Sequence, residues 1–553
     1  MKKYKSLVIV FASLLFSLLV NILLQRHFFR IDLTTEKRYS ISDNTKKLMS
    51  DLQQPVTLNI YLDGDLNSGF LRLKNSLREL LDEFSIYASK DFNYNFINPS
   101  SAKTEEERYE TYLRLASRGM NPTTIYERDS EGKSIQKIVF PWVEIITQND
   151  TFPVNLLKNV PGNSGVENLN ISIENLEYEL TDALRILNTK SIKKVAFIEG
   201  HGELFENFVY DASLAFSRYF QVDRGVLGDD VCVLDDYEAI IIANPLTEFS
   251  ESDKFIIDQY IMNGGKVLWF IDGVSFSFDE LSETGISPII DKNLNLSDML
   301  FCYGIRINPI LLQDVQCLQM PINVSGGPNP QYESMPWFYS PLLLPNPMHA
   351  ISRNITQVKA DFCSSIDFIS GNDAVSKTIL LTTSTSTHQQ TIPSMIDLRE
   401  MPSEDDNGYF NKSFIPVAAI LEGEFNSAFT NRLVPEGIAR MSKRRNKSVD
   451  TRMLVVADGD IIKNDTEGLM GFDRYSGVQF GNKDFVLNAL LYLTDEANWF
   501  HLKNRTFKIR MLNKTKIYSY FSFLKWANIV FPILLLFLCG GLYLLIRYFR
   551  YKK

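Results

Sequence analysis

Two stretches without a charged residue stand near the ends of the chain. Residues 7–24 and residues 529–546 each contain 18 consecutive positions without Asp, Glu, Lys, Arg or His. Because an α-helix rises about 1.5 Å per residue, such a stretch reaches roughly 27 Å, the thickness of the hydrocarbon core of a bilayer. The pattern predicts two transmembrane helices. A cleaved signal peptide is the alternative for the first stretch, although no small-residue cleavage site follows it.

Between these stretches the apolar positions recur with the spacings of strands and helices. Residues 56–62 alternate apolar and polar side chains as a strand does, and the leucines of residues 70–88 recur every three or four positions as in a helix. Short strands and one charged helix follow, with a single strand expected at residues 135–147. We therefore expect a small αβ domain at residues 55–190.

The second part of the middle region alternates strands and helices in the order typical of a parallel, doubly wound, Rossmann-like sheet. We expect this domain at residues 191–497, with an insertion at about 275–450 in which residues 321–347, rich in Pro and Gly, form a long loop. The strands are expected at residues 193–198, 238–243, 266–271 and 452–457, and the helices at residues 208–220, 250–262 and 483–493.

Basic residues at both ends predict the orientation in the membrane. Lys and Arg stay on the cytoplasmic side of a span, so both termini are expected inside and the bulk of the chain outside. The basic residues are Lys2, Lys3, Lys5, Arg547, Arg550, Lys552 and Lys553. The remaining parts are a cytoplasmic tail and first helix at residues 1–28, a juxtamembrane stalk at 29–54, a return stalk at 498–526, and the second helix with its basic tail at 527–553.

Composition narrows the class of partner. The net charge is −9, and the two tails hold only basic charges, so the region between the spans is more acidic still. An acidic surface argues against nucleic acid and against docking on anionic lipid, so contact with membrane lipid is expected through the spans alone. Four cysteines of the middle region are widely spaced, and the sequence leaves open whether they pair or remain free thiols. They are Cys232, Cys302, Cys317 and Cys363.

Several catalytic motifs are absent. The sequence has no Gly-x-x-x-x-Gly-Lys-Ser/Thr phosphate loop, no Gly-x-Ser-x-Gly, no His-Glu-x-x-His, no Cys-x-x-Cys and no Gly-x-Gly-x-x-Gly after a strand. ATP hydrolysis by a phosphate loop and dinucleotide binding are therefore not expected. No cofactor and no metal are predicted.

Two strand ends carry the candidate site residues. Gly200, His201, Gly202 and Glu203 follow the strand at residues 193–198, at the end where ligands bind in such sheets. The glycines allow close approach of a ligand, and His201 and Glu203 could serve as acid and base or hold a metal. The alternative is a tight structural corner, and we favour structure or recognition over catalysis.

A second pair of candidates follows the strand at residues 452–457. Asp458 and Asp460 could bind a cation, because carboxylate oxygens are suitable ligands. Turn geometry and helix capping explain the same two residues equally well. Both are candidates for ligand or partner binding.

The segment after the first apolar stretch is distinctive. Residues 30–42 read RIDLTTEKRYSIS, which resembles the juxtamembrane signature of the auxiliary ABC-transporter family that includes the gliding-motility protein GldG. The turn at residues 200–203 and the order of the parts match that family as well. The positions that carry the motif are Arg30, Asp32, Leu33, Thr34, Glu36, Arg38, Tyr39 and Ser40.

The resemblance implies a subunit of a membrane complex that works with a separate ABC permease and a separate ATPase. It implies gliding motility and associated secretion in Bacteroidota, an inner-membrane location, a periplasmic bulk, and periplasmic gliding or secretion components as further partners. It also implies a second domain that is similar to class I glutamine amidotransferases. No cysteine stands where the nucleophile of those enzymes is expected, so we predict a non-catalytic scaffold or binding subunit. The alternatives are a membrane-tethered hydrolase or amidotransferase-like enzyme at the turn, and a periplasmic solute receptor.

Overall fold

The computed structural model describes Phe16 and most of the chain from residue 41 to residue 551. The gaps are residues 129–133, 149, 159–163, 189–191, 324–330, 354, 372–373, 399–401, 439–443, 466–467 and 495–519. The expected first span, apart from Phe16, and the juxtamembrane motif lie outside the described residues, as does most of the return stalk. The chain divides into two compact units, one made of Met1–Arg38 with Thr506–Lys553 and the other of Tyr39–Arg505.

The C-terminal apolar stretch forms one long helix, α13 (Phe521–Tyr551), with Pro532 in its interior. Within the described residues it contains the only candidate membrane span, Lys525–Tyr551, and none of its 18-residue apolar window is buried. The helix begins six residues before the expected position. Length and composition thus make α13 a candidate membrane helix, in agreement with the sequence pattern.

A four-stranded sheet organises the first part of the larger unit. Its strands are β1 (Val56–Ile60), β2 (Phe92–Phe96), β5 (Trp142–Ile146) and β6 (Thr151–Asn155), in the order β2-β1-β5-β6. The associated helices are α2 (Asp43–Ser50), α3 (Ser68–Tyr87), α4 (Glu105–Ala116) and α5 (Gly165–Asn188), and a hairpin is formed by β3 (Thr123–Arg128) and β4 (Ser134–Val139). The strand expected at residues 135–147 is therefore two strands, interrupted at Pro141, which has no amide hydrogen for a ladder.

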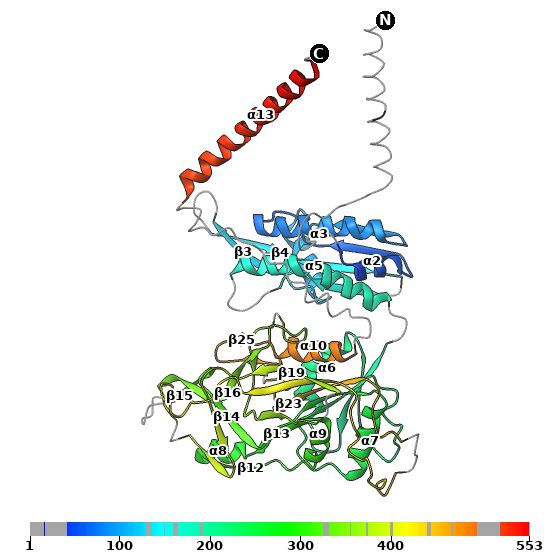
Figure 1. Ribbon diagram of the computed structural model, residues 1–553, viewed down its shortest axis with the longest axis vertical. Helices are drawn as coiled ribbons and strands as arrows, with labels where there is room; N and C mark the ends of the chain where they lie inside the picture. The colour runs from blue at the N-terminus through cyan, green and yellow to red at the C-terminus, as the bar shows by residue number, and fades with distance from the viewer. Residues whose placement is uncertain are drawn as a thin grey trace. The chain divides into compact units, whose positions relative to one another are not determined.

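Alternation along these strands separates two faces. Leu58, Ile60 and Val143 share a hydrophobic core with the leucines of α3 and α5, which cover that face (Figure 1). The neighbouring positions of the same strands, such as Asn59 and Glu144, point to the other face.

The second sheet is built around five parallel strands. They are β7 (Lys194–Glu199), β8 (Gln221–Val226), β9 (Ala239–Ala243), β10 (Lys266–Phe270) and β23 (Thr451–Val456). Their order is β23-β10-β9-β7-β8, so β7 is flanked by the strands that come second and third in the chain. The sequence pattern missed β8, because this outer strand is polar and only partly buried.

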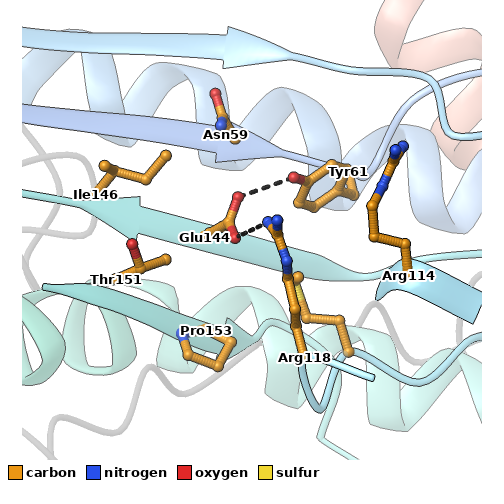
Figure 2. A pocket seen from close by; sticks show the side chains of 9 residues that line it. Asn59, Tyr61, Arg114, Arg118, Glu144, Ile146, Thr151 and Pro153 are labelled. Carbon is orange, nitrogen blue, oxygen red and sulfur yellow. Dashed lines mark hydrogen bonds and ion pairs between the residues drawn. The ribbon is translucent and has the colours of Figure 1, made fainter. Parts of the chain in front are cut away.

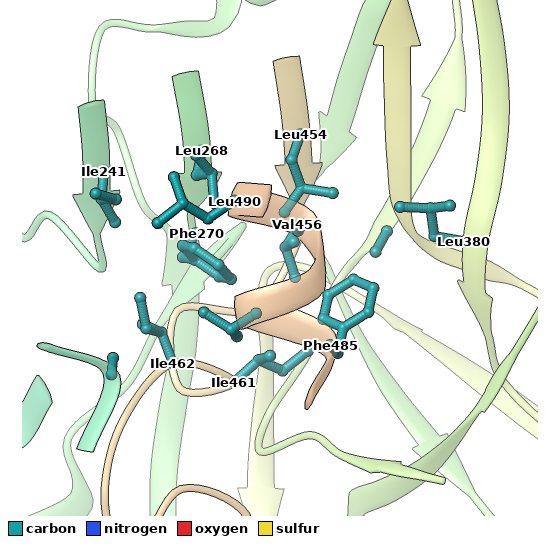
Figure 3. Packing of buried hydrophobic residues seen from close by; sticks show 14 of the residues in the cluster. Ile241, Leu268, Phe270, Leu380, Leu454, Val456, Ile461, Ile462, Phe485 and Leu490 are labelled. Atoms are coloured by element: carbon teal, nitrogen blue, oxygen red, sulfur yellow. The ribbon is translucent and has the colours of Figure 1, made fainter. Parts of the chain in front are cut away.

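Helices cover both faces of this sheet. The η1 turn (Glu206–Val209) leads into α6 (Tyr210–Ser217), which packs on one face together with α10 (Asn482–Thr494), while α7 (Glu251–Met262) and α9 (Ser297–Tyr303) pack on the other. Figure 3 shows Phe485 and Leu490 of α10 against Phe270 and Val456. Because successive strand residues alternate between the two cores, the strands are apolar throughout.

The insertion extends the same sheet beyond β23 with antiparallel strands. They are β15 (Cys317–Asn323), β16 (Tyr332–Pro345), β19 (Val375–Thr382) and β22 (Pro416–Gly423), in the order β15-β16-β19-β22, with β17 (Val358–Lys359) beside β16. The predicted α/β class is confirmed, but the large sheet is mixed, not wholly parallel.

The prediction of a long loop at residues 321–347 is wrong. Pro336 and Pro341 lie in β16, which pairs with β19 only at its C-terminal end and meets β15 across an irregular register.

Small elements complete the insertion and its surroundings. They are β11 (Val274–Ser275), α8 (Phe278–Thr284), β12 (Ile286–Asp291), β13 (Ile305–Asn308), β14 (Ile310–Asp314), β18 (Ser365–Phe368), β20 (Thr387–Thr391), β21 (Ser394–Asp397), β24 (Phe472–Asp473) and β25 (Val478–Gln479). The four widely spaced cysteines form no disulfide in this structure. All of them are free thiols, namely Cys232, Cys302, Cys317 and Cys363.

Candidate functional site

Both predicted sets of site residues lie at the carboxyl ends of the parallel strands. The chain leaves β7 toward the face of α6 and leaves β9 toward the face of α7, so the two connections diverge between these adjacent strands. In open α/β sheets this divergence is the usual place for a ligand crevice. The turn that contains His201 stands at this point, directly after β7.

The imidazole of His201 is held on both nitrogens and on one ring face. Its Nδ1 lies 3.2 Å from Glu203 Oε1, and its Nε2 lies 3.2 Å from Oδ2 of Asp253 on α7. The ring stacks on Phe249 with 3.6 Å between ring centroids. The backbone N–H of His201 also donates to Glu203 Oε2 at 2.7 Å. The ring is buried and has no free nitrogen for a substrate.

Two carboxylates determine the protonation of this histidine. Burial alone lowers the pKa of His201, but the hydrogen bonds and charges of Glu203 and Asp253 outweigh burial and raise the pKa above its usual value of 6.5. Each imidazole nitrogen lies against a carboxylate, so the ring is held in a fixed orientation and offers no free nitrogen to accept a proton from a substrate.

The glycines of the turn are required by backbone geometry. Gly200 and Gly202 have φ values of 118° and 75°, which side chains other than glycine rarely adopt. The carbonyl of His201 accepts hydrogen bonds from the N–H groups of Leu246 and Thr247 at 2.7 and 2.9 Å. The loops after β7 and β9 are thus tied to each other by two backbone hydrogen bonds.

Exposed apolar side chains surround the turn. Phe205, Val226 and Leu246 are 73%, 68% and 65% exposed, respectively. Val226 stands beside Gly200, and Leu246 stands beside Gly202. Apolar side chains gathered on a surface are typical of a protein contact. The arrangement around the turn therefore suits recognition of a partner better than chemistry.

The second predicted pair belongs to a buried acidic cluster. Oxygen Oδ2 of Asp458 accepts the N–H of Asp361 at 2.9 Å, and its Oδ1 accepts the N–H of Asp460 at 2.7 Å. The N–H of Gly459 donates to Asp272, at the end of β10. Lys292 and Lys463 each lie 3.0 Å from an acid, Asp272 and Asp460 respectively. The carboxylates therefore hold the loops after β10 and β23 together.

Repulsion and burial act on these acids together. Burial, followed by the charges of Asp272, Asp460 and Asp361, raises the pKa of Asp458 well above its usual range. Burial and the charge of Asp272 raise the pKa of Asp460 to about 6, although Lys463 opposes the shift. In the part of the chain that the structure describes, no group of three or more His, Cys, Asp or Glu is arranged to hold a metal ion.

The two predicted sets lie at the same, carboxyl-terminal end of the parallel strands, but β9 and β10 stand between β7 and β23 and the two sets form separate networks. The sequence contains only weak signals for the residues of these two networks that were not predicted. Asp253 is visible only as the fourth residue of an N-terminal capping sequence that begins at Ser250, and Asp361 and Lys292 stand in the insertion with no motif around them. Cys363 is fully buried, and burial followed by the charge of Asp458 raises the pKa of its thiol, which makes it inert as a nucleophile.

Comparison with known proteins identifies the family. The family described as "ABC-type uncharacterized transport system" matches residues 192–489, which is more than half of the chain and contains both strand-end sets. The chain belongs to this auxiliary ABC-transport family. A second match, "Domain of unknown function (DUF7088)", covers residues 35–146, the region of the four-stranded sheet.

Two further likenesses are more distant. An uncharacterized protein of Borreliella burgdorferi is 25% identical over 355 residues, which is 63% of this chain and 62% of that protein, so the match leaves over a third of the relative uncovered. The N-terminal domain of mmIFT52, a solved structure, is 14% identical and is matched over 55% of this chain and 98% of its own length, with a TM-score of 0.32. Such a TM-score supports no conclusion about fold or function. Membership in the ABC auxiliary family is consistent with an accessory, non-enzymatic role in a transport system.

Proposed function

We propose that this member of the ABC auxiliary family is a non-catalytic periplasmic scaffold or binding subunit of a membrane complex. It works with a separate permease and a separate ATPase, and it serves gliding motility and associated secretion as GldG does. Two spans hold it in the inner membrane with both termini in the cytoplasm. The observation that carries the proposal is the family match over residues 192–489, and the candidate membrane helix α13 supports it.

The geometry of the strand ends supports the non-catalytic part of the proposal. His201 is fixed between two carboxylates, and its carbonyl ties the loop after β7 to the loop after β9. The enzyme alternative requires a free base or nucleophile at this place, and neither His201 nor Cys363 provides one. The turn therefore serves as a rigid corner that presents an apolar surface to a partner.

The partner surface of this proposal consists of Phe205, Val226 and Leu246. Replacing Leu246 or Val226 by Asp places a charge in the centre of the contact, so recovery of partners with the chain should fall about tenfold. The matched control is Leu433→Asp, because Leu433 is 93% exposed and belongs to a different loop, the one that follows β22. Equal partner recovery with Leu246→Asp, Val226→Asp and Leu433→Asp would count against this surface.

The proposal as a whole is tested by purifying the full chain in mild detergent from its native cells and identifying what accompanies it by mass spectrometry. We expect a polytopic permease and a phosphate-loop ATPase in fixed ratio. A folded chain recovered alone at full yield contradicts the proposal. His201→Ala addresses the enzyme alternative, since loss of cellular function with unchanged abundance and unchanged partner recovery would favour a catalytic or ligand site at the turn.

A further inference from the structure

A cavity of about 670 Å³ lies on the face of the four-stranded sheet opposite α3 and α5 (Figure 2). The strand register explains which side chains line it. Asn59, Glu144 and Pro153 are cross-strand partners on β1, β5 and β6, and Ile146 and Thr151 form the next row. Residues at alternating positions of a strand share a face, so the lining is a direct consequence of this register.

The floor of the cavity is a buried carboxylate. Glu144 is 3% exposed, and its two oxygens accept hydrogen bonds from Tyr61 Oη at 2.9 Å and from Arg118 Nη1 at 2.8 Å. Burial, together with the hydrogen bond to Glu144, raises the pKa of Tyr61 to about 12, so the phenol remains a donor. Only the carboxylate side of this ion pair is buried, because the Arg118 side chain is 54% exposed. The guanidinium therefore stays open to the cavity while Glu144 holds it in place.

A second arginine stands at the same cavity. Arg114 lies in the last turn of α4, one helical turn before Arg118, and both line the cavity. Gly119, with φ of 82°, ends this helix directly after Arg118. Figure 2 shows the Arg114 side chain beside the ring of Tyr61. Among the residues that the structure describes, the guanidinium of Arg114 has no hydrogen-bond or ion-pair partner.

The charges of the lining select the ligand. Two arginines face one carboxylate, which leaves a single uncompensated positive charge in a chain whose net charge is −9. A guanidinium presents a planar pair of N–H donors that matches the two oxygens of a carboxylate. Glu144 repels a second negative charge, so a monoanion fits better than a phosphate dianion. Asn59 and Thr151 add hydrogen-bonding groups, and Ile146 and Pro153 add an apolar wall.

We propose that this cavity binds a carboxylate-bearing ligand, with Arg114 paired to the carboxylate and Arg118 held in place by Glu144. The carboxylate belongs either to a small acid or to the C-terminus of a peptide. The inference does not depend on the partner surface around His201, because the residues involved lie in the other sheet.

The test is calorimetric titration of the full chain in detergent with four probes. These are N-acetyl-alanine, acetyl-trialanine with a free C-terminus, the same tripeptide as its amide, and inorganic phosphate. We expect at least one carboxylate probe to bind, with the amide at least tenfold weaker. Binding of N-acetyl-alanine equal to that of the free tripeptide assigns a small acid, and preference for the tripeptide assigns a peptide C-terminus.

Substitutions in α4 test whether the carboxylate binds in this cavity. Arg114→Gln should weaken carboxylate binding at least tenfold with little change in thermal unfolding, since the guanidinium forms no hydrogen bond or ion pair with the described residues. Arg108→Gln, on the same helix but outside the lining, is the matched control and should bind as the unaltered chain does. Equal binding of the acid and the amide, binding of phosphate alone, no binding of any carboxylate at millimolar concentration, or unchanged binding by Arg114→Gln would each overturn the proposal.

Discussion

His201 owes its state to three neighbours that come from different parts of the chain. Glu203 belongs to the same turn, whereas Phe249 and Asp253 follow β9. The sequence suggested a reactive pair in His201 and Glu203, and it also allowed a structural corner. The position of Asp253, 52 residues away, favours the corner, because this second carboxylate leaves the imidazole with no open nitrogen.

The charge state of His201 predicts a pH dependence of stability. Because its pKa is raised in the folded chain, protonation favours folding, and this contribution is full below the unfolded pKa and is lost as pH rises through the folded pKa. His201→Gln should therefore lower the melting temperature more at about pH 5.5 than at about pH 8.5. Thermal unfolding of both chains at the two pH values measures this. His388→Gln, which alters a histidine outside this network, is the control, and an equal loss at both pH values contradicts the assignment.

The turn glycines allow backbone strain to be separated from crowding. Gly202→Ala should cost more than the roughly 1–2 kcal/mol of a left-handed residue, because a Cβ at this position meets Cβ of Leu246 at 3.0 Å. Gly228→Ala, at φ of 78° with open space around it, should show the strain alone. Denaturant unfolding compares the two variants. Adding Leu246→Gly, which removes this Cβ, should recover the excess in Gly202→Ala, and no recovery would mean that crowding is not the cause.

At the scale of elements, periodicity was reliable where apolar residues are continuous and unreliable where polar residues or prolines interrupt them. The helix expected at residues 483–493 is α10 (Asn482–Thr494), and the strand expected at residues 452–457 is β23. The polar outer strand β8 and the proline-containing strand β16 were missed. Both lie toward an edge of the sheet, where fewer ladder hydrogen bonds and less burial are needed, so the usual sequence signals are weak.

The packing of α10 on the parallel strands predicts a large effect of one substitution. Phe485 is fully buried against the sheet (Figure 3), so Phe485→Ala should reduce the free energy of unfolding by about 3–5 kcal/mol. Phe301→Ala, on α9 but 53% exposed, removes the same atoms and should cost far less. Chemical denaturation reports both values. Similar losses in the two variants would show that α10 is not anchored by this core.

At the scale of the whole molecule, one candidate membrane helix is described and a second is predicted from sequence. Family membership places the chain in a transport system, and α13 provides a membrane attachment by length and composition. The number of spans and the side on which the large unit lies remain predictions. They follow from the uncharged stretch at residues 7–24 and from the basic residues at both ends.

Two measurements test this topology. A chain that ends at residue 505 should remain in the membrane fraction after carbonate extraction, because the first span still holds it. In a cysteine-free chain, Ser403→Cys should react with a membrane-impermeant thiol reagent added to spheroplasts, whereas Lys553→Cys should react only after lysis. Release of the truncated chain into the soluble fraction would show that residues 7–24 do not anchor it, and early labelling of Lys553→Cys would reverse the orientation.

The sequence by itself determined the local features of this protein. Apolar spacing predicted most helices and the buried parallel strands, and a long uncharged stretch predicted α13, because burial and membrane insertion act on short windows of side chains. Only the tertiary structure decided which strand ends meet. The pairing of His201 with Asp253, the contact of Asp458 with Asp361 and the joining of Tyr61, Arg118 and Glu144 depend on strand order and register. These are set by contacts between residues far apart in the chain, to which a local pattern is insensitive.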